Sequence, residues 1–336
     1  WILKNASREM DAKMGYIFKV MRWIFCFVAC GITFGCTNSG FQNANSRPCI
    51  LSMNRMIHDC VERVVGNRLA TAVLIKGSLD PHAYEMVKGD KDKIAGSAVI
   101  FCNGLGLEHT LSLRKHLENN PNSVKLGERL IARGAFVPLE EDGICDPHIW
   151  MDLSIWKEAV IEITEVLIEK FPEWSAEFKA NSEELVCEMS ILDSWAKQCL
   201  STIPENLRYL VSGHNAFSYF TRRYLATPEE VASGAWRSRC ISPEGLSPEA
   251  QISVRDIMAV VDYINEHDVS VVFPEDTLNQ DALKKIVSSL KKSHLVRLAQ
   301  KPLYSDNVDD NYFSTFKHNV CLITEELGGV ALECQR

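Results

Sequence analysis

Three histidines of this 336-residue chain lie in turns that lead into a predicted helix. Two of them end the same tripeptide, in Asp80-Pro81-His82 and in Asp146-Pro147-His148. Asp suits the N-cap of a helix and Pro its first position, so each of these histidines is expected in a first helical turn. His214 follows an apolar run that ends in small residues, and a carboxylate, Asp306, lies in a similar turn before the last predicted helix.

Three imidazoles and one carboxylate form a complete ligand set for a divalent transition metal, because neutral imidazole suits Zn, Mn, Fe and Cu and the carboxylate offsets the charge. For any one of these histidines alone, a hydrogen-bonded polar role is the commoner explanation. Asp306 alone is a weaker candidate, because Asp309 and Asp310 lie close by. The shared turn context, at the strand ends where open parallel sheets bind ligands, favours metal binding by His82, His148, His214 and Asp306. The other six histidines lie within predicted helices or beside charged residues, where a solvated or helix-face role is expected: His58, His109, His116, His267, His294 and His318.

Short apolar runs alternate with amphipathic runs in both halves of the chain. In the first half, strands are expected at residues 48–51, 70–75 and 98–102 and helices at 54–65, 84–94 and 108–117. In the second half, strands are expected at 209–211, 269–273 and 295–299 and helices at 217–225, 254–266, 281–290 and 312–327. This alternation predicts an α/β fold with two lobes, each a mostly parallel sheet flanked by helices.

A long helix is expected to join the two lobes. Residues 154–170 and 175–200 show no strand or turn signal except Phe171-Pro172, where the first helix must stop. A helix of 26 residues is ~39 Å long, enough to run the length of the molecule, and a coiled-coil arm is the alternative. We therefore predict a metal-binding lobe at 48–172, a connecting helix at 173–202 and a second metal-binding lobe at 203–336. Residues 227–251, rich in Pro and Gly, are expected to form a surface loop.

The N-terminal segment is predicted to direct export. Basic residues precede an apolar run of 13 residues from Trp23 to Gly35, which is too short to span a membrane. Residues 1–36 are therefore interpreted as an export signal and residues 37–47 as a tether. Cys36 is the candidate for lipidation, with a signal cut elsewhere or an uncleaved anchor as alternatives.

The composition excludes several classes of protein. With 46% hydrophobic residues the chain is globular, and a net charge of −8 makes nucleic acid a poor partner. Of 12 cysteines, nine remain after the three in the signal region, an odd number without a CxxC motif. Most of the nine are therefore expected to be small buried residues, with one or two disulfides at most.

Five segments resemble, in order, the signatures of the metal-binding solute-binding proteins of bacterial ABC importers. They are Asp80-Pro81-His82-Ala83-Tyr84-Glu85, Asn103-Gly104-Leu105-Gly106-Leu107-Glu108, Asp146-Pro147-His148-Ile149-Trp150-Met151-Asp152, Gly213-His214-Asn215-Ala216-Phe217-Ser218-Tyr219-Phe220 and Leu303-Tyr304-Ser305-Asp306. The resemblance covers residues 48–332 and looks closest to the chlamydial periplasmic branch of the family. Two departures concern residues 227–251, where the family connection is often shorter, and residues 127–145, which lack the His-rich loop of many zinc-dedicated members.

The resemblance implies two α/β lobes joined by one long helix, with the metal held between them. It places the ligands at His82, His148, His214 and Asp306 and implies a periplasmic monomer, with Cys36 as the candidate site for a lipid anchor. The implied partner is an ABC importer permease in the inner membrane, and the divalent Fe, Mn or Zn ion is the transported ligand.

Two other functions are alternatives to metal transport, a zinc hydrolase and a surface adhesin. A zinc hydrolase would need an open coordination position and a general base, but HExxH is absent and Glu275, the one candidate base, is better explained as a partner that orients a His. The third hypothesis is a surface adhesin lipoprotein in which the metal only stabilises the fold. For release of the metal we expect the stiff connecting helix to limit lobe opening. The turns carrying His214 and Asp306 are expected to loosen instead, because the turn at 305–310 is polar.

Overall fold

The computed structural model describes residues 47–141, 143–247, 252–290 and 296–333. The predicted export signal at 1–36 and all but the last residue of the predicted tether lie outside the described residues. None of the described helices combines the length and the apolar character that crossing a membrane requires.

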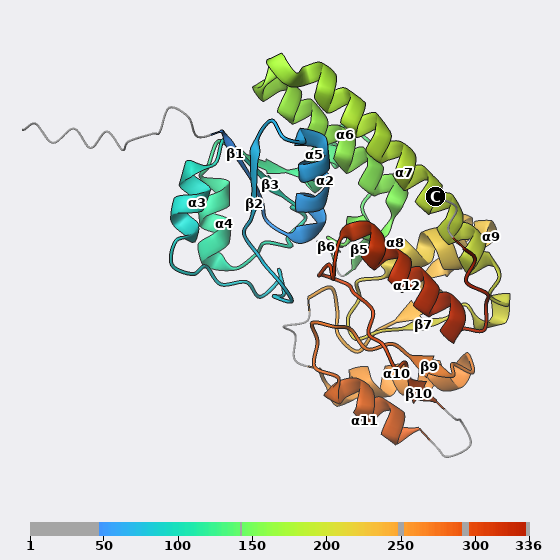
Figure 1. The fold of residues 1–336 in the computed structure, drawn as a ribbon. Coiled ribbons are helices and arrows are strands. Elements are labelled where there is room, and N and C mark those ends of the chain that lie inside the picture. The colour runs from blue at the N-terminus through green and yellow to red at the C-terminus, as the bar shows by residue number, and fades with distance from the viewer. Residues whose placement is uncertain (1–46, 142, 248–251, 291–295, 334–336) are drawn as a thin grey trace, which may run out of the picture. The chain divides into compact units, whose positions relative to one another are not determined.

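The first half of the described chain contains a four-stranded parallel sheet in the order β2-β1-β3-β4 (Figure 1). Its strands are β1 (Cys49–Ser52), β2 (Ala70–Val73), β3 (Val99–Cys102) and β4 (Ser123–Lys125). The connecting helices are α2 (Arg55–Val65), α3 (Asp90–Gly96), α4 (Leu111–Glu118) and α5 (Leu126–Ala132). The α2 helix begins where the side chain of Asn54 accepts a hydrogen bond from the N–H of Ile57, 3.0 Å away.

The two central strands, β1 and β3, are buried on both faces, because their alternate residues enter different apolar clusters. Ile50 and Phe101 pack with residues of α2 and α5, whereas Leu51 and Ile100 pack with residues of α3 and α4. Such burial on both faces explains why the strands read as continuous apolar runs.

Two long helices follow the first sheet. They are α6 (Leu153–Lys170) and α7 (Ser175–Ser201), separated by the 3₁₀ turn η2 (Pro172–Trp174). The break occurs at Phe171-Pro172, as predicted, and α7 has 27 residues. The two helices pack against each other (Figure 1).

The second half of the chain contains two pairs of short parallel strands. The strands are β7 (Leu210–Val211), β8 (Cys240–Ile241), β9 (Val271–Val272) and β10 (Arg297–Leu298). The β7 strand pairs with β8 and β9 with β10, and the N–H of Phe273 donates to the carbonyl of Val211 at 2.8 Å. The main helices are α10 (Val254–Glu266), α11 (Asp281–Ser289) and α12 (Tyr312–Glu326). The predicted α/β fold with parallel sheets and flanking helices is thus confirmed.

Residues 84–94 were expected to form one helix, but the helix covers only the end of that stretch. Gly89 has a φ of 96°, and α3 begins at Asp90. The buried Asp90 carboxylate accepts bonds from the Tyr84 hydroxyl at 2.7 Å and the Val87 N–H at 2.9 Å. These bonds hold the preceding residues in an irregular loop, so the helical prediction for them was wrong.

The stretch at 227–251 was predicted as a surface loop, and this is also wrong for its described part. It contains α9 (Pro228–Ser233), η5 (Ala235–Arg239) and the strand β8. Thr227 and Glu230 form a reciprocal capping box at the start of α9, with Pro228 in its first turn.

The remaining elements lie in the connections. They are the antiparallel hairpin β5 (Glu140–Glu141) and β6 (Ile144–Cys145), the 3₁₀ turns η1 (Ile149–Met151) and η3 (Glu205–Leu207), the short helix α8 (Ser218–Phe220) and the π turn η4 (Thr221–Leu225).

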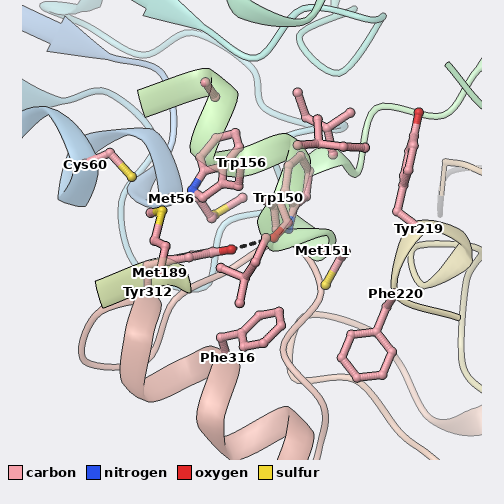
Figure 2. Packing of buried hydrophobic residues seen from close by; sticks show 14 of the residues in the cluster. Met56, Cys60, Trp150, Met151, Trp156, Met189, Tyr219, Phe220, Tyr312 and Phe316 are labelled. Carbon is pink, nitrogen blue, oxygen red and sulfur yellow. Dashed lines mark hydrogen bonds between the residues drawn. The ribbon is translucent and has the colours of Figure 1, made fainter. Parts of the chain in front are cut away.

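One apolar cluster runs through both halves of the described chain. It includes residues of α2, α6, α7 and α12, and Figure 2 shows Tyr312 and Phe316 of α12 near Trp150 and Trp156. The Tyr312 hydroxyl donates to the Trp150 carbonyl at 2.6 Å, and the rings of Tyr312 and Trp156 lie 6.0 Å apart. The two halves therefore share a core rather than meeting only at a hinge.

The described cysteines fit the expectation of small buried residues only in part. Free thiols are found at Cys49, Cys60, Cys102, Cys145, Cys187 and Cys240. Cys60 and Cys102 are buried, and burial raises the pKa of both thiols, so they are packing residues. Cys187, in contrast, is exposed on α7.

Candidate metal centre

His82 lies in the irregular connection between β2 and α3. Its N–H donates to the Asp80 carboxylate at 2.8 Å, so the Asp of the tripeptide fixes the backbone of the His two residues later. The imidazole is only 2% exposed. No ion pair links the Asp80 carboxylate to the His82 ring, although both residues belong to the described chain.

His148 precedes η1 and is fully buried. The Asp146 carboxylate accepts from the His148 N–H at 2.9 Å and lies 2.7 Å from its Nδ1. Because a carboxylate can only accept, Nδ1 carries the proton and the lone pair is left on Nε2. The second Asp-Pro-His tripeptide therefore holds its ring as well as its backbone.

His214 follows β7 and is held by Glu275, which follows β9. One oxygen of Glu275 accepts from the N–H groups of Gly213 at 2.7 Å and His214 at 3.0 Å. The other oxygen lies 2.7 Å from Nδ1 of His214. A Cβ on Gly213 would lie 2.9 Å from Leu278 and 3.1 Å from the Glu275 carboxylate, so a larger residue here would press on the side chain that holds His214.

Asp306 completes the cluster from the turn before α12. Its Oδ2 lies 3.0 Å from Nε2 of His214, and its Oδ1 lies 3.4 Å from Nε2 of His148 and 3.6 Å from Nε2 of His82. The Ser305 hydroxyl donates to Asp306 Oδ2 at 3.1 Å. Asp306 is 3% exposed, so the carboxylate is buried among the imidazoles.

The structure thus brings together all four residues singled out in the sequence, with one ligand atom of each within 4.8 Å of the others. Nε2 of His148 lies 3.3 Å from Nε2 of His82 and 3.3 Å from Nε2 of His214. Ligands at 2.0–2.1 Å from a tetrahedral metal are separated by about 3.3–3.4 Å. The nitrogen spacing therefore matches the edge of a tetrahedron around a metal ion.

The charges in this cluster favour a cation at its centre. Burial alone would lower the pKa of His148 and His214, but the carboxylates beside them outweigh it and raise both, that of His214 well above its usual range. Burial would likewise raise the pKa of Asp306, but the three imidazoles hold it well below its usual range. The pKa of His82 is lowered, because burial outweighs the attraction of Asp306. In the metal-free protein, protons on the imidazoles thus neutralise the negative charge of Asp306, and a bound metal ion could neutralise it instead.

The expectation that the Asp306 turn is loosely anchored was wrong. Leu303, Ser305 and Val308 are at most 6% exposed. The side chain of Asn319 bonds both the N–H and the carbonyl of Tyr304, at 3.0 and 2.7 Å. The turn is polar in sequence but buried in the fold, so its composition is a poor guide to its mobility.

Sequence reasoning missed the roles of Asp146 and Trp150. Asp146 was interpreted only as a helix cap, although the repeated tripeptide was the signal that it could reach the ring of His148. Trp150 was quoted only as part of a motif; its ring lies 5.2 Å from that of His148. Of the remaining histidines, His294 lies outside the described residues, whereas His109 lies near the site, with its ring 6.1 Å from that of His82.

Known proteins resemble this chain over nearly its whole length. The family model for the periplasmic zinc-uptake complex component A (ZnuA) matches residues 50–326. The metal-binding protein YtgA of Chlamydia trachomatis is 60% identical over 315 residues, which cover 94% of this chain and 97% of that protein. The manganese-binding lipoprotein MntA of Bacillus subtilis is 26% identical over 94% of this chain and 99% of its own length.

A solved structure agrees with these relationships. The crystal structure of Fe(III)-bound YtgA from Chlamydia trachomatis superposes with a TM-score of 0.84 and 63% identity, covering 85% of this chain and 100% of that chain. The predicted two-lobe fold and the predicted similarity to the chlamydial branch are confirmed. The chain therefore belongs to the ZnuA family of periplasmic metal-binding proteins, the solute-binding components of ABC importers, and is not an enzyme.

Proposed function

We propose that His82, His148, His214 and Asp306 are the four ligands of the metal ion that this protein carries. The observation that supports the ligand set most directly is the spacing of 3.3 Å from Nε2 of His148 to Nε2 of both His82 and His214, which is close to the edge of a tetrahedral site. Asp146 and Glu275 support the assignment, because each keeps the proton on Nδ1 of its histidine and leaves Nε2 to the metal.

Among Fe, Mn and Zn, we propose iron as the principal cargo. The ligand set itself suits all three metals, so affinity alone would follow the Irving–Williams order rather than the biological role. The support for iron is the Fe(III)-bound structure of the relative with 63% identity.

Delivery of the metal requires a place in the cell envelope and a partner. We propose that residues 1–36 direct export, that residues 37–47 form a tether attached by lipid at Cys36, and that the protein acts as a monomer. The lobes proposed are residues 48–172 and 203–336, joined by 173–202. The partner is the permease of an ABC importer, which receives the metal from the periplasmic side.

Metal content and affinity test the ligand set. Single changes of His148 or Asp306 to Ala should abolish stoichiometric binding of Fe, Mn or Zn, as measured by elemental analysis of protein purified from its own cell envelope. His116→Gln is the matched control, because His116 lies on α4 and its Nδ1 contacts the carbonyl of Ser112, 2.7 Å away. Full occupancy in the Ala variants would refute the ligand assignment. Zinc or manganese in the native protein in place of iron would refute the choice of cargo.

A further inference from the structure

Trp150 contacts one proposed ligand, His148, and the residue that immediately precedes another, Asp306. Its ring centroid lies 5.2 Å from that of His148, at an angle of 66°. Its indole N–H donates to the carbonyl of Ser305 at 2.8 Å, and Ser305 immediately precedes Asp306. Trp150 is 2% exposed, so this bond is shielded from water.

We infer that Trp150 is a positioning residue for metal binding, which holds His148 and the turn carrying Asp306 in fixed positions relative to each other. This inference rests on the proposed ligand set. The two ligands are 158 positions apart in sequence (306 minus 148), and they come from different halves of the fold. The indole joins them without being a ligand itself.

The hydrogen bond from the Trp150 indole satisfies the Ser305 carbonyl in the turn that carries Asp306. Ser305 is 1% exposed, so without the indole N–H its carbonyl would be buried beside no other donor among the described contacts. A buried carbonyl without a donor is unfavourable, and the turn would move to reach water or another donor. Because the next residue is Asp306, that movement would displace the carboxylate from the imidazoles.

The position of Trp150 itself does not depend on this bond. The Tyr312 hydroxyl donates to the Trp150 carbonyl at 2.6 Å (Figure 2), and the N–H of Tyr312 donates to the Asp59 carboxylate at 2.8 Å. The backbone of Trp150 is thus fixed from the other side. Replacing the indole by a phenyl ring should therefore remove the bond to Ser305 and leave the apolar packing largely in place.

The test compares Trp150→Phe with a control that loses the same kind of bond elsewhere. The indole of Trp195 donates to the carbonyl of Leu332 at 2.8 Å and is likewise nearly buried, but it contacts no proposed ligand. Zn²⁺ alone is used as the probe, with its affinity and dissociation rate measured by competition with a chromophoric chelator. Removing a group that orients a ligand typically weakens metal binding about 10–100-fold.

We expect Trp150→Phe to weaken Zn²⁺ binding about tenfold or more, mainly through faster dissociation, and Trp195→Phe to change it by less than about twofold. X-ray absorption should still show imidazole ligands in Trp150→Phe, with the carboxylate contribution changed. Equal affinities for wild type and Trp150→Phe, or equal losses in the two variants, would overturn the inference. Asp306→Ala separates the two proposals, since unchanged binding by that variant would refute the ligand set itself.

A measurement on the unmodified protein covers the case in which Trp150→Phe does not fold. Coupling between two contacts is reciprocal, so a bond that strengthens metal binding must itself be strengthened by the metal. The indole N–H of Trp150 should therefore exchange with solvent more slowly in the Zn²⁺-loaded protein than in the metal-free protein. The exchange rate of the Trp195 indole N–H should be the same with and without Zn²⁺. An exchange rate at Trp150 that also does not change with Zn²⁺ would count against the inference.

Discussion

Replacing Glu275 by Gln should disturb the metal site without removing a ligand. In the wild-type protein one Glu275 oxygen accepts two backbone N–H groups and the other lies 2.7 Å from Nδ1 of His214. The Gln amide oxygen can keep the backbone bonds, but its NH₂ group then faces Nδ1. Two donors cannot face each other, so the proton of His214 would move to Nε2, the nitrogen that points at the metal.

The Glu275→Gln change should lower the metal affinity, because the metal must displace the proton on Nε2 of His214. Binding would require loss of the proton from Nε2 and would leave Nδ1 without its carboxylate. We expect the affinity to fall about 10–100-fold, which is ~1.4–2.8 kcal/mol. Asp146→Asn should act in the same direction, because Asp146 lies at the same distance, 2.7 Å, from Nδ1 of His148.

Asp80→Asn is the matched control, since it makes the same chemical change in the other Asp-Pro-His tripeptide. Among the described residues, Asp80 accepts a hydrogen bond only from the backbone N–H of His82, and an Asn oxygen can do the same. Its effect on affinity should stay within about threefold. Affinities are compared by chelator competition, with metal-free thermal unfolding as a check on folding. Similar losses for Asp80→Asn and Glu275→Gln would refute the reasoning, because they would show a general effect of charge rather than control of the tautomer.

Three further predictions concern protons, motion and stability. The pKa values of His148 and His214 are raised, so these rings stay protonated to a higher pH in the metal-free protein; metal affinity should therefore fall as the pH is lowered, starting above ~6.5, and calorimetry in two buffers should detect proton release near pH 7. Metal removal should increase hydrogen exchange mainly at residues 76–89, which contain no helix or strand, and exchange spread uniformly along α7 would contradict this. Asp193→Asn should lower the free energy of unfolding at pH 7 by ~2 kcal/mol, because its carboxylate accepts from Arg223 at 2.6 and 2.9 Å. Burial would raise the pKa of Asp193, but those bonds and others outweigh it and lower the pKa. The loss of unfolding free energy should therefore be complete above pH ~3.8 and should disappear at lower pH. Urea unfolding that shows the same loss at every pH would contradict this prediction.

The elements that position the site could be predicted because their signals are local. The apolar strands at 98–102 and the break at Phe171-Pro172 depend on a few adjacent residues, and both were predicted correctly. The turns at His148 and His214 also follow from short local motifs, whereas the expected first helical turn at His82 was wrong, because α3 begins only at Asp90. The convergence of these turns follows from the parallel sheets, since the carboxyl ends of parallel strands lie at one edge.

The incorrect predictions concern features that depend on which polar groups the fold buries. The irregular loop before α3 depends on bonds to the buried Asp90, and the composition of residues 84–94 alone favours a helix. The Asp306 turn appears mobile from its polar composition, yet Asn319 and Trp150 anchor it from 13 positions after it and 156 before it (319 minus 306, 306 minus 150). A polar segment is exposed to solvent only when the fold offers no buried hydrogen-bond partners for its polar groups.

The manner of metal release follows from unequal support of the ligands. His148 and His214 each have a carboxylate at Nδ1, and the Asp306 turn is buried and held by Trp150. Among the described residues no carboxylate pairs with Nδ1 of His82, whose N–H donates to Asp80, and His82 lies in a connection without regular structure.

A core shared by both halves also opposes wide opening of the lobes, because separating them would expose its apolar residues to water. Polar bonds act in the same direction: Arg55 of α2 donates to the carbonyl of Asp310 at 3.0 Å, and Asp59 accepts from the N–H at the start of α12. Release by a small movement of the His82 segment breaks one metal bond and leaves this core intact. Since it costs the least burial, we expect the first step of release to be the loss of His82, with the importer needed to free the ion from the three ligands that remain.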